Sequence, residues 1–150
     1  MERGMNRDFV EMLCALTETE AEFLVVGAYA VAAHGHPRAT GDLDIWVRPS
    51  PENAEKVFMA LQVFGAPLAN LSREDLSQLN TVFQIGVAPF RIDLLTSITG
   101  VDFSQAWQHK IEMTLEGQEF YCMGLNDLLA NKKATGRPKD LADIDSLENL

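Results

Sequence analysis

Two aspartates, Asp42 and Asp44, stand two residues apart in a short segment that otherwise favours a β-strand. Leu43 and the run Ile45–Val47 are apolar and mostly β-branched or aromatic, as in buried strands. Side chains at positions i and i+2 of a strand project from the same face, with Cα atoms about 6.5 Å apart. Like charges so placed repel each other, so the pair requires either exposure to solvent or a nearby cation.

A third aspartate, Asp93, lies in a second strand-like segment, Phe90–Leu95. The alternation of side chains along a strand places Asp93 on the same face as Arg91. Two interpretations are open from these residues alone. Asp93 faces solvent beside Arg91, or it joins Asp42 and Asp44 in a site for a divalent cation.

A glycine separates a predicted strand from a predicted helix. The strand covers Glu22–Val26, the chain turns at Gly27, and the alanine-rich segment Ala28–His34 favours a short helix. Backbone N–H groups at such a turn lie at the positive end of the helix dipole, where a phosphate binds well. The same residues also fit an ordinary strand-to-helix turn, and both interpretations remain open here.

The remaining hydrophobic pattern predicts a chain of alternating helices and strands. Ser50 is expected to cap one helix, with Pro51 at its first position, and Asn126 to cap another. A short helix is expected to open at Ser72. The predicted helices are residues ~5–19, 51–64, 104–110, 126–134 and 138–150, and the further predicted strands are 42–47, 81–85, 90–96, 111–115 and 119–123.

Length and composition favour one globular domain over residues 1–150. Hydrophobic residues make up 47% of the chain, and no apolar run approaches the ~20 residues of a membrane span. The two cysteines, Cys14 and Cys122, have no metal-site or redox spacing, so we expect reduced thiols and a cytoplasmic location. The net charge of −10 argues against general binding to nucleic-acid backbones, but it allows a local basic patch that holds one nucleotide.

The order of these motifs resembles the nucleotidyltransferase superfamily of the DNA polymerase β type. The resemblance rests on Phe23–Ala28, Thr40–Val47, Phe90–Leu95 and the segment Asn131–Ile144, and it spans roughly residues 20–147. The chain is most similar to small stand-alone bacterial and archaeal members, including AbiEii-like toxins. The resemblance implies an α/β (α+β) fold, with a central mixed β-sheet flanked by helices and a C-terminal helical segment.

The resemblance also implies an activity, which is the metal-dependent transfer of an NMP from an NTP to a hydroxyl acceptor with release of pyrophosphate. The implied catalytic and metal-binding residues are Asp42, Asp44 and Asp93, which would bind two Mg²⁺ ions, with Mn²⁺ as an alternative. Three carboxylates without His or Cys suit these hard cations. The implied acceptor is a tRNA, a protein or a small molecule.

The implied nucleotide-binding residues are Gly27, Ala28, Arg38, Lys132 and Arg137. The last two belong to the densest basic cluster of this acidic chain. Two interpretations of that cluster are open. In one, the cluster is a solvated helix end, with Lys132 and Lys133 near a helix C-terminus. In the other, it is functional: Lys132 and Arg137 reach the triphosphate, or Asp140 anchors Arg137. Arg38 either meets phosphate or is a loop charge.

One position departs from the family pattern. The family's turn usually reads Gly-Gly or Gly-Ser, and the serine hydroxyl helps hold the triphosphate, whereas this chain has Gly27-Ala28. The missing hydroxyl favours one alternative to an ordinary enzyme, a nucleotide-binding module with weak or no transfer. A further alternative, which does not depend on this position, is a nucleotidylating toxin neutralised by an antitoxin-type protein partner.

Overall fold

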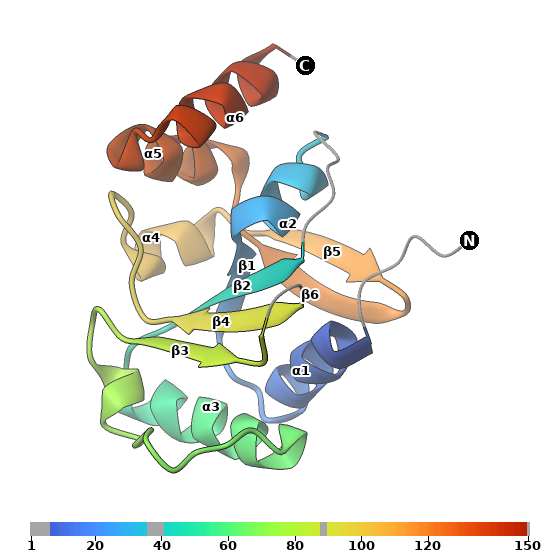
Figure 1. Cartoon of the computed structure of the whole chain (residues 1–150), viewed down its shortest axis with the longest axis vertical. Helices are drawn as coiled ribbons and strands as arrows, with labels where there is room; N and C mark the ends of the chain where they lie inside the picture. The colour runs from blue at the N-terminus through green and yellow to red at the C-terminus, as the bar shows by residue number, and fades with distance from the viewer. Residues whose placement is uncertain (1–6, 36–40, 88–89, 150) are drawn as a thin grey trace.

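A six-stranded mixed sheet forms the centre of the described chain (Figure 1). The structure is a computed structural model, and it describes residues 7–35, 41–87 and 90–149. The strand order is β3-β4-β2-β1-β6-β5. The strands are β1 Phe23–Val26, β2 Asp42–Val47, β3 Val82–Ile85, β4 Arg91–Leu95, β5 Ile111–Leu115 and β6 Gln118–Cys122.

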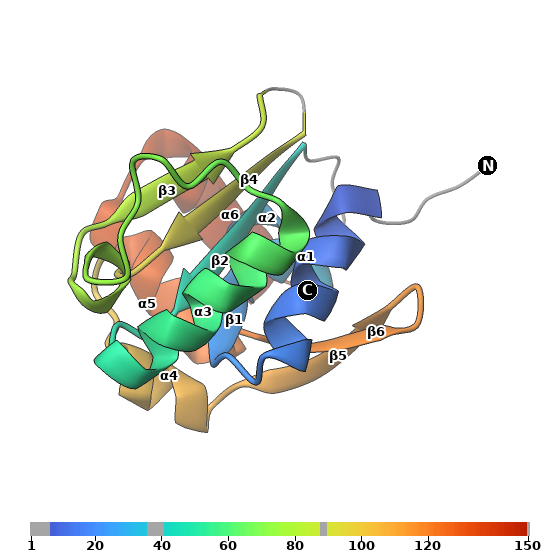
Figure 2. The same ribbon diagram turned by 90° about the horizontal axis from the view of Figure 1, so that it is seen from below.

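Helices cover both faces of this sheet. In Figures 1 and 2, α1 (Arg7–Glu18) and α3 (Pro51–Phe64) lie on one face, and α2 (Gly27–Ala33), α5 (Leu125–Thr135) and α6 (Pro138–Glu148) lie on the other. A short helix, α4 (Phe103–Gln108), precedes the β5–β6 hairpin. The predicted α+β fold with a mixed sheet and a C-terminal helical segment is confirmed.

The central strand β2 pairs differently with its two neighbours. It runs antiparallel to β1 and parallel to β4, which places Asp42 opposite Arg91 and Asp44 opposite Asp93. The neighbouring strands β3 and β4 form an antiparallel pair. Because β2 and β4 are parallel, their acidic residues meet at the same level of the sheet.

Side-chain alternation along β2 divides the core into two layers. Leu43 and Ile45 are fully buried in the layer that packs against α1 and α3. Trp46 is buried in the opposite layer, together with residues of α2, α4 and α5. The same alternation puts Asp42 and Asp44 on the Trp46 face, so the acids lie on the side of the sheet that carries α2, α5 and α6.

Most predicted element boundaries agree with the structure to within one or two residues. Ser50 caps α3 by accepting a hydrogen bond from the Asn53 backbone N–H, as predicted. The prediction that Asn126 caps α5 is wrong, because the helix begins at Leu125 and its extended N-cap residue is Gly124. The helix expected at Ser72 is reduced to the 3-10 turn η1 (Asp75–Ser77). Within the described ranges, no helix is both long and apolar enough to cross a membrane.

Candidate active site

The parallel register of β2 and β4 brings the three predicted carboxylates together. Asp44 and Asp93 are direct cross-strand partners, and neighbouring strands lie about 4.8 Å apart. Asp42 lies two residues before Asp44 on the same face. Asp93 is only 8% exposed, so the interpretation of Asp93 as a solvent-facing residue is wrong.

Arg91 bridges two of these acids. Its Nε and Nη2 atoms donate to the two carboxylate oxygens of Asp93 at 2.9 and 3.2 Å, and Nη2 also donates to Asp42 Oδ2 at 3.3 Å. These hydrogen bonds and charges raise the pKa of Arg91 further above its ordinary value, the hydrogen bond to Asp93 most of all. The sequence alone indicates Arg91 only as a neighbour of Asp93. Its spacing of two residues from Asp93 was a usable signal, but its contact with Asp42 depends on the strand register.

Asp44 has no comparable partner. No group of the described residues donates a hydrogen bond to its half-buried carboxylate. Burial raises the pKa of Asp44 to about 6, with further contributions from the negative charges of Asp93 and Asp42, while Arg91 and Lys139 offset only part of the effect. The site therefore holds a carboxylate whose negative charge is incompletely neutralised.

Gly27 lies directly against this carboxylate. Its φ of +69° belongs to the left-handed region, and a Cβ atom built on it would stand 2.2 Å from Asp44 Oδ2. Both the backbone conformation and the contact therefore require glycine. The predicted succession of strand, glycine and short helix is confirmed, since β1 ends at Val26 and α2 starts at Gly27.

A cleft of about 370 Å³ opens over Asp42 and Asp44, between the end of β1, the loop after β4, and α5. Six of the eight residues predicted for the site line it. Asp93 is not among its lining residues and lies beside Asp44 on the next strand, and Arg38 lies outside the described residues. The lining residues are Val26, Gly27, Ala28, Asp42, Asp44, Leu95, Ser97, Ile98, Thr99, Asn131, Lys132, Thr135, Arg137 and Lys139.

A buried ion-pair network fixes the basic side of the cleft. Lys132 is 5% exposed, and its Nζ lies 3.0 Å from Asp143 Oδ2 and 3.5 Å from Asp140 Oδ1. The interpretation of Lys132 as part of a solvated helix end is therefore wrong. It holds for Lys133, which is exposed and pairs with Glu148 at 3.4 Å.

Arg137 is anchored by Asp140, as one form of the functional interpretation predicted. Its Nε and Nη2 atoms donate to the two oxygens of that carboxylate at 2.7 and 3.2 Å, and Thr135 Oγ1 donates to it at 2.7 Å. These hydrogen bonds hold the pKa of Asp140 well below its usual range, against the opposing effect of burial. The side chain of Arg137 is nevertheless 61% exposed and lines the cleft, so anchoring by Asp140 and access to a ligand coexist.

The carboxylates do not converge on a single point. In the described part of the chain, no group of three or more His, Cys, Asp or Glu side chains is arranged closely enough to hold a metal ion. Asp42 and Asp93 are directed to the Arg91 guanidinium instead. The three aspartates are adjacent but form no preformed ligand cage, and their metal-binding role stays a prediction.

Comparison with solved structures identifies the fold. The chain matches a protein of Thermotoga maritima assigned as a nucleotidyltransferase, with a TM-score of 0.63 and 14% sequence identity over 98% of this chain and 97% of the other. The protein has a nucleotidyltransferase fold. It also matches the lincosamide antibiotic adenylyltransferase LnuA, solved with lincomycin bound, with a TM-score of 0.61 and 14% identity over 98% of both chains. No protein-family model and no curated protein matches the chain by sequence.

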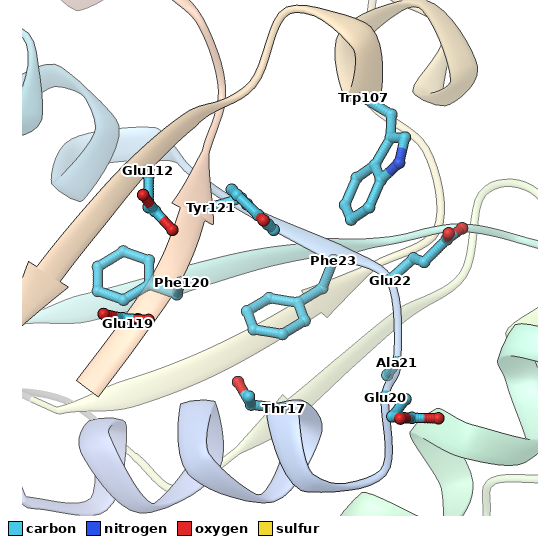
Figure 3. A pocket seen from close by; sticks show the side chains of 10 residues that line it. All are labelled: Thr17, Glu20, Ala21, Glu22, Phe23, Trp107, Glu112, Glu119, Phe120 and Tyr121. Atoms are coloured by element: carbon cyan, nitrogen blue, oxygen red, sulfur yellow. The ribbon is translucent and has the colours of Figure 1, made fainter.

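A second cavity, of about 270 Å³, shares no lining residue with the cleft. Figure 3 shows its walls, which combine aromatic rings with carboxylates where the end of α1 faces the β5–β6 hairpin. Trp107 in this wall already carries the Lys110 ammonium 4.2 Å from its ring centre. None of the predicted site residues of the nucleotidyltransferase fold lines this cavity, so it plays no part in the site described above.

Proposed function

We propose that this protein is a metal-dependent nucleotidyltransferase that moves an NMP from an NTP to a hydroxyl acceptor and releases pyrophosphate. The observation that carries the proposal is the cleft in which Asp44, half-buried and without a hydrogen-bond donor among the described residues, lies beside Asp42 and Asp93. The nucleotidyltransferase fold supports it.

The donor chemistry of these residues, though not their present spacing, fits divalent cations, preferably two Mg²⁺ ions, with Mn²⁺ as an alternative. The donor set consists of carboxylates, which hard cations prefer, and Asp44 carries a negative charge that its surroundings neutralise incompletely. Asp42 and Asp44 would hold the ions and Asp93 would complete the site. Bound there, the metal would stabilise the charge that develops on the attacking and leaving oxygens of an in-line displacement.

The basic side of the cleft suits the phosphates of the NTP. Arg137 is exposed toward the cleft and held by Asp140, and Lys132 is held by Asp140 and Asp143, so both cations are positioned before a ligand arrives. Fixed cations of this kind bind phosphate oxygens with little loss of side-chain entropy. The backbone N–H groups of Gly27 and Ala28 would bind phosphate oxygens from the opposite wall.

The resemblance assigns the action on the acceptor to Asp93, whose two carboxylate oxygens accept hydrogen bonds from Arg91 in this structure. Asp93 would orient the acceptor hydroxyl or take its proton as the oxygen attacks the α-phosphorus. The new bond joins the acceptor oxygen to the α-phosphorus, the bond from the α-phosphorus to its bridging oxygen breaks, and pyrophosphate leaves with that oxygen. The partners of the reaction are therefore an NTP and an acceptor, and a small-molecule acceptor is supported by the structural similarity to LnuA.

The test is incubation with Mg²⁺ and each of the four α-labelled NTPs, together with a panel of tRNA, protein and small-molecule acceptors. We expect pyrophosphate release and a labelled adduct with at least one acceptor, and neither product with Asp44→Asn. Equal release by Asp44→Asn would contradict the proposal. Nucleotide binding without release, across all four NTPs and the whole panel, would instead support a binding module, the alternative favoured by Ala28 in place of serine.

A further inference from the structure

The second cavity, of about 270 Å³, lies apart from the cleft, where the end of α1 faces the β5–β6 hairpin. Strand pairing explains why space is left there. β1 and β6 pair at Val25 and Cys122, and the described residues form no further pair toward the starts of these two strands. Phe23 and Phe120, two positions earlier on each strand, line the cavity instead (Figure 3).

Aromatic rings form much of the wall of this cavity. Besides Phe23 and Phe120, the rings of Trp107 from α4 and Tyr121 from β6 line it. Trp107 and Tyr121 meet edge to face, with ring centres 5.6 Å apart and ring planes at 77°. The face of an aromatic ring carries partial negative charge and attracts cations. The rings therefore suit a ligand that combines an apolar body with a positive charge.

Two of these rings already attract an ammonium group of the chain itself. Nζ of Lys110 lies 4.2 Å from the centre of the Trp107 ring and 4.8 Å from that of the Tyr121 ring, within the ~6 Å of a cation–π interaction. The same Nζ donates to the Trp107 backbone oxygen at 3.2 Å. Lys110 is not among the residues that line the cavity. The cavity therefore lies beside rings that hold a cation, without being filled by that cation.

The charged groups of the wall all have the same sign. Four carboxylates line the cavity, and no described Lys, Arg or His side chain does. Arg48 forms an ion pair with one of them, and Lys110 lies over the neighbouring rings. With both cations counted against the four acids, a surplus of two negative charges remains. The carboxylates belong to Glu20, Glu22, Glu112 and Glu119.

The groups that would contact a ligand are accessible from solvent. Tyr121 is 37% exposed, and Glu112 and Glu119 are exposed on the same face of the hairpin. A surplus of carboxylates beside aromatic faces repels a triphosphate and attracts a cation. A volume of about 270 Å³ is slightly below the usual range of drug-sized sites, so the ligand is a small one.

We propose that the second cavity binds a small organic cation, in which an ammonium group is carried on an apolar body. The charge lies against the Trp107 and Tyr121 rings and the surrounding carboxylates, and the apolar body lies along the aromatic wall. The cavity shares no lining residue with the cleft, so this site does not depend on nucleotidyl transfer. Such an ammonium group has two sources, a free amine and a lysine side chain of another protein.

The test uses the two tryptophans of the chain, Trp46 and Trp107, which give two indole N–H signals in ¹⁵N-labelled protein. Of these, Trp107 lines the cavity, and Trp107→Phe identifies its signal. The probes are n-butylammonium and choline, with the neutral analogues n-butanol and 3,3-dimethylbutanol as controls. We expect both cations to shift the Trp107 signal saturably and the Trp46 signal not at all, and the neutral analogues to bind at least about tenfold more weakly.

Variants of exposed residues separate the local charges from the net charge. Glu112→Gln combined with Glu119→Gln is expected to weaken choline binding about tenfold. Glu74→Gln combined with Glu116→Gln changes the net charge equally at exposed positions outside the cavity, and we expect it to leave binding unchanged. Lys110→Met is expected to tighten choline binding, because it removes a cation that competes for the same rings.

The peptide acetyl-Gly-Lys-Gly-amide distinguishes the two sources of the ammonium group. Tighter binding of the peptide than of n-butylammonium would support a lysine side chain as the ligand, and the reverse would support a free amine. Equal binding of the cations and their neutral analogues would overturn the proposal, as would the absence of any saturable shift of the Trp107 signal. Equal affinity of the Glu112/Glu119 double variant and its control for choline would also overturn it.

Discussion

Replacement of Asp44 by asparagine is expected to stabilise the protein while it abolishes transfer. The carboxylate of Asp44 is half-buried, lies beside Asp42 and Asp93, and receives no hydrogen bond from the described residues. An asparagine of the same shape removes the negative charge and therefore the cost of burying it. The site would then lack the carboxylate that the proposed metal requires.

The magnitude follows from the pKa. Burial and the neighbouring carboxylates raise the pKa of Asp44 from 3.8 to about 6, and each pKa unit corresponds to about 1.4 kcal/mol. The ionised group thus lowers the free energy of unfolding by about 3 kcal/mol at neutral pH. For a chain of this size that corresponds to a rise of roughly 10 °C in Tm for Asp44→Asn.

The pH dependence has a definite sign. Because the folded-state pKa of this acid is raised, the folded protein binds the proton more tightly than the unfolded chain does. The penalty is absent below about pH 4, grows between about pH 4 and pH 6, and is complete above about pH 6. The stability difference between Asp44→Asn and the wild type is expected to follow the same course.

The assay is urea denaturation of both proteins in EDTA across this pH range, repeated with Mg²⁺. We expect the variant to be the more stable protein at about pH 7.5 in EDTA, and we expect Mg²⁺ to stabilise the wild type alone. A variant that is less stable than the wild type at neutral pH would refute the reasoning. So would a stability difference that does not change with pH.

Three further substitutions test other parts of the site. Gly27→Ala is expected to displace the Asp44 carboxylate and lower kcat/KM on the order of 100-fold, because the alanine Cβ would stand 2.2 Å from Asp44 Oδ2. A variant with the kcat/KM of the wild type would show that this close approach is unimportant. Lys132→Met is expected to cost about 3–5 kcal/mol in urea denaturation, because it leaves Asp140 and Asp143 buried without their ammonium partner; an unchanged midpoint would contradict this. Asp140→Asn is expected to be less stable than the wild type at neutral pH, and this stability difference is expected to shrink as the pH falls toward the lowered pKa of Asp140. Thermal unfolding measured across acidic pH checks this, and a difference that grows on acidification would refute it.

The sequence predicted the fold well where local rules decide the structure. The alternation of apolar residues in β2, the glycine between β1 and α2, and the Ser50 cap of α3 depend on near neighbours in the chain, and the structure agrees with each. The prediction that Asn126 caps α5 was wrong because several residues near the start of a helix can occupy the N-cap position, and in this structure that residue is Gly124.

The grouping of the three aspartates was predictable from the sequence, but their contacts were not. Asp42, Asp44 and Asp93 were found from motif order, whereas the bridge by Arg91 between Asp42 and Asp93 requires the parallel register of β2 with β4. Strand register is set by long-range packing, which a single sequence does not display.

The burial of Lys132 was hidden for a similar reason. Lysines in the last turn of a helix usually favour the helix dipole and face solvent, as Lys133 does. Lys132 is buried because α6 folds back on α5 and brings Asp140 and Asp143 to it. That contact depends on how the two helices pack, and the periodicity of either helix alone does not reveal it.

Our proposal that Asp42, Asp44 and Asp93 hold the metal for nucleotidyl transfer can be tested by a single structure determination. It is a crystal structure with Mn²⁺ and a non-hydrolysable NTP analogue, in which the anomalous signal locates the metal. We expect Mn²⁺ to be bound by the carboxylates of Asp42 and Asp44, Arg91 to be released from Asp42, and the phosphates to lie on Lys132 and Arg137. Nucleotide bound in the cleft with no metal on these carboxylates would contradict it.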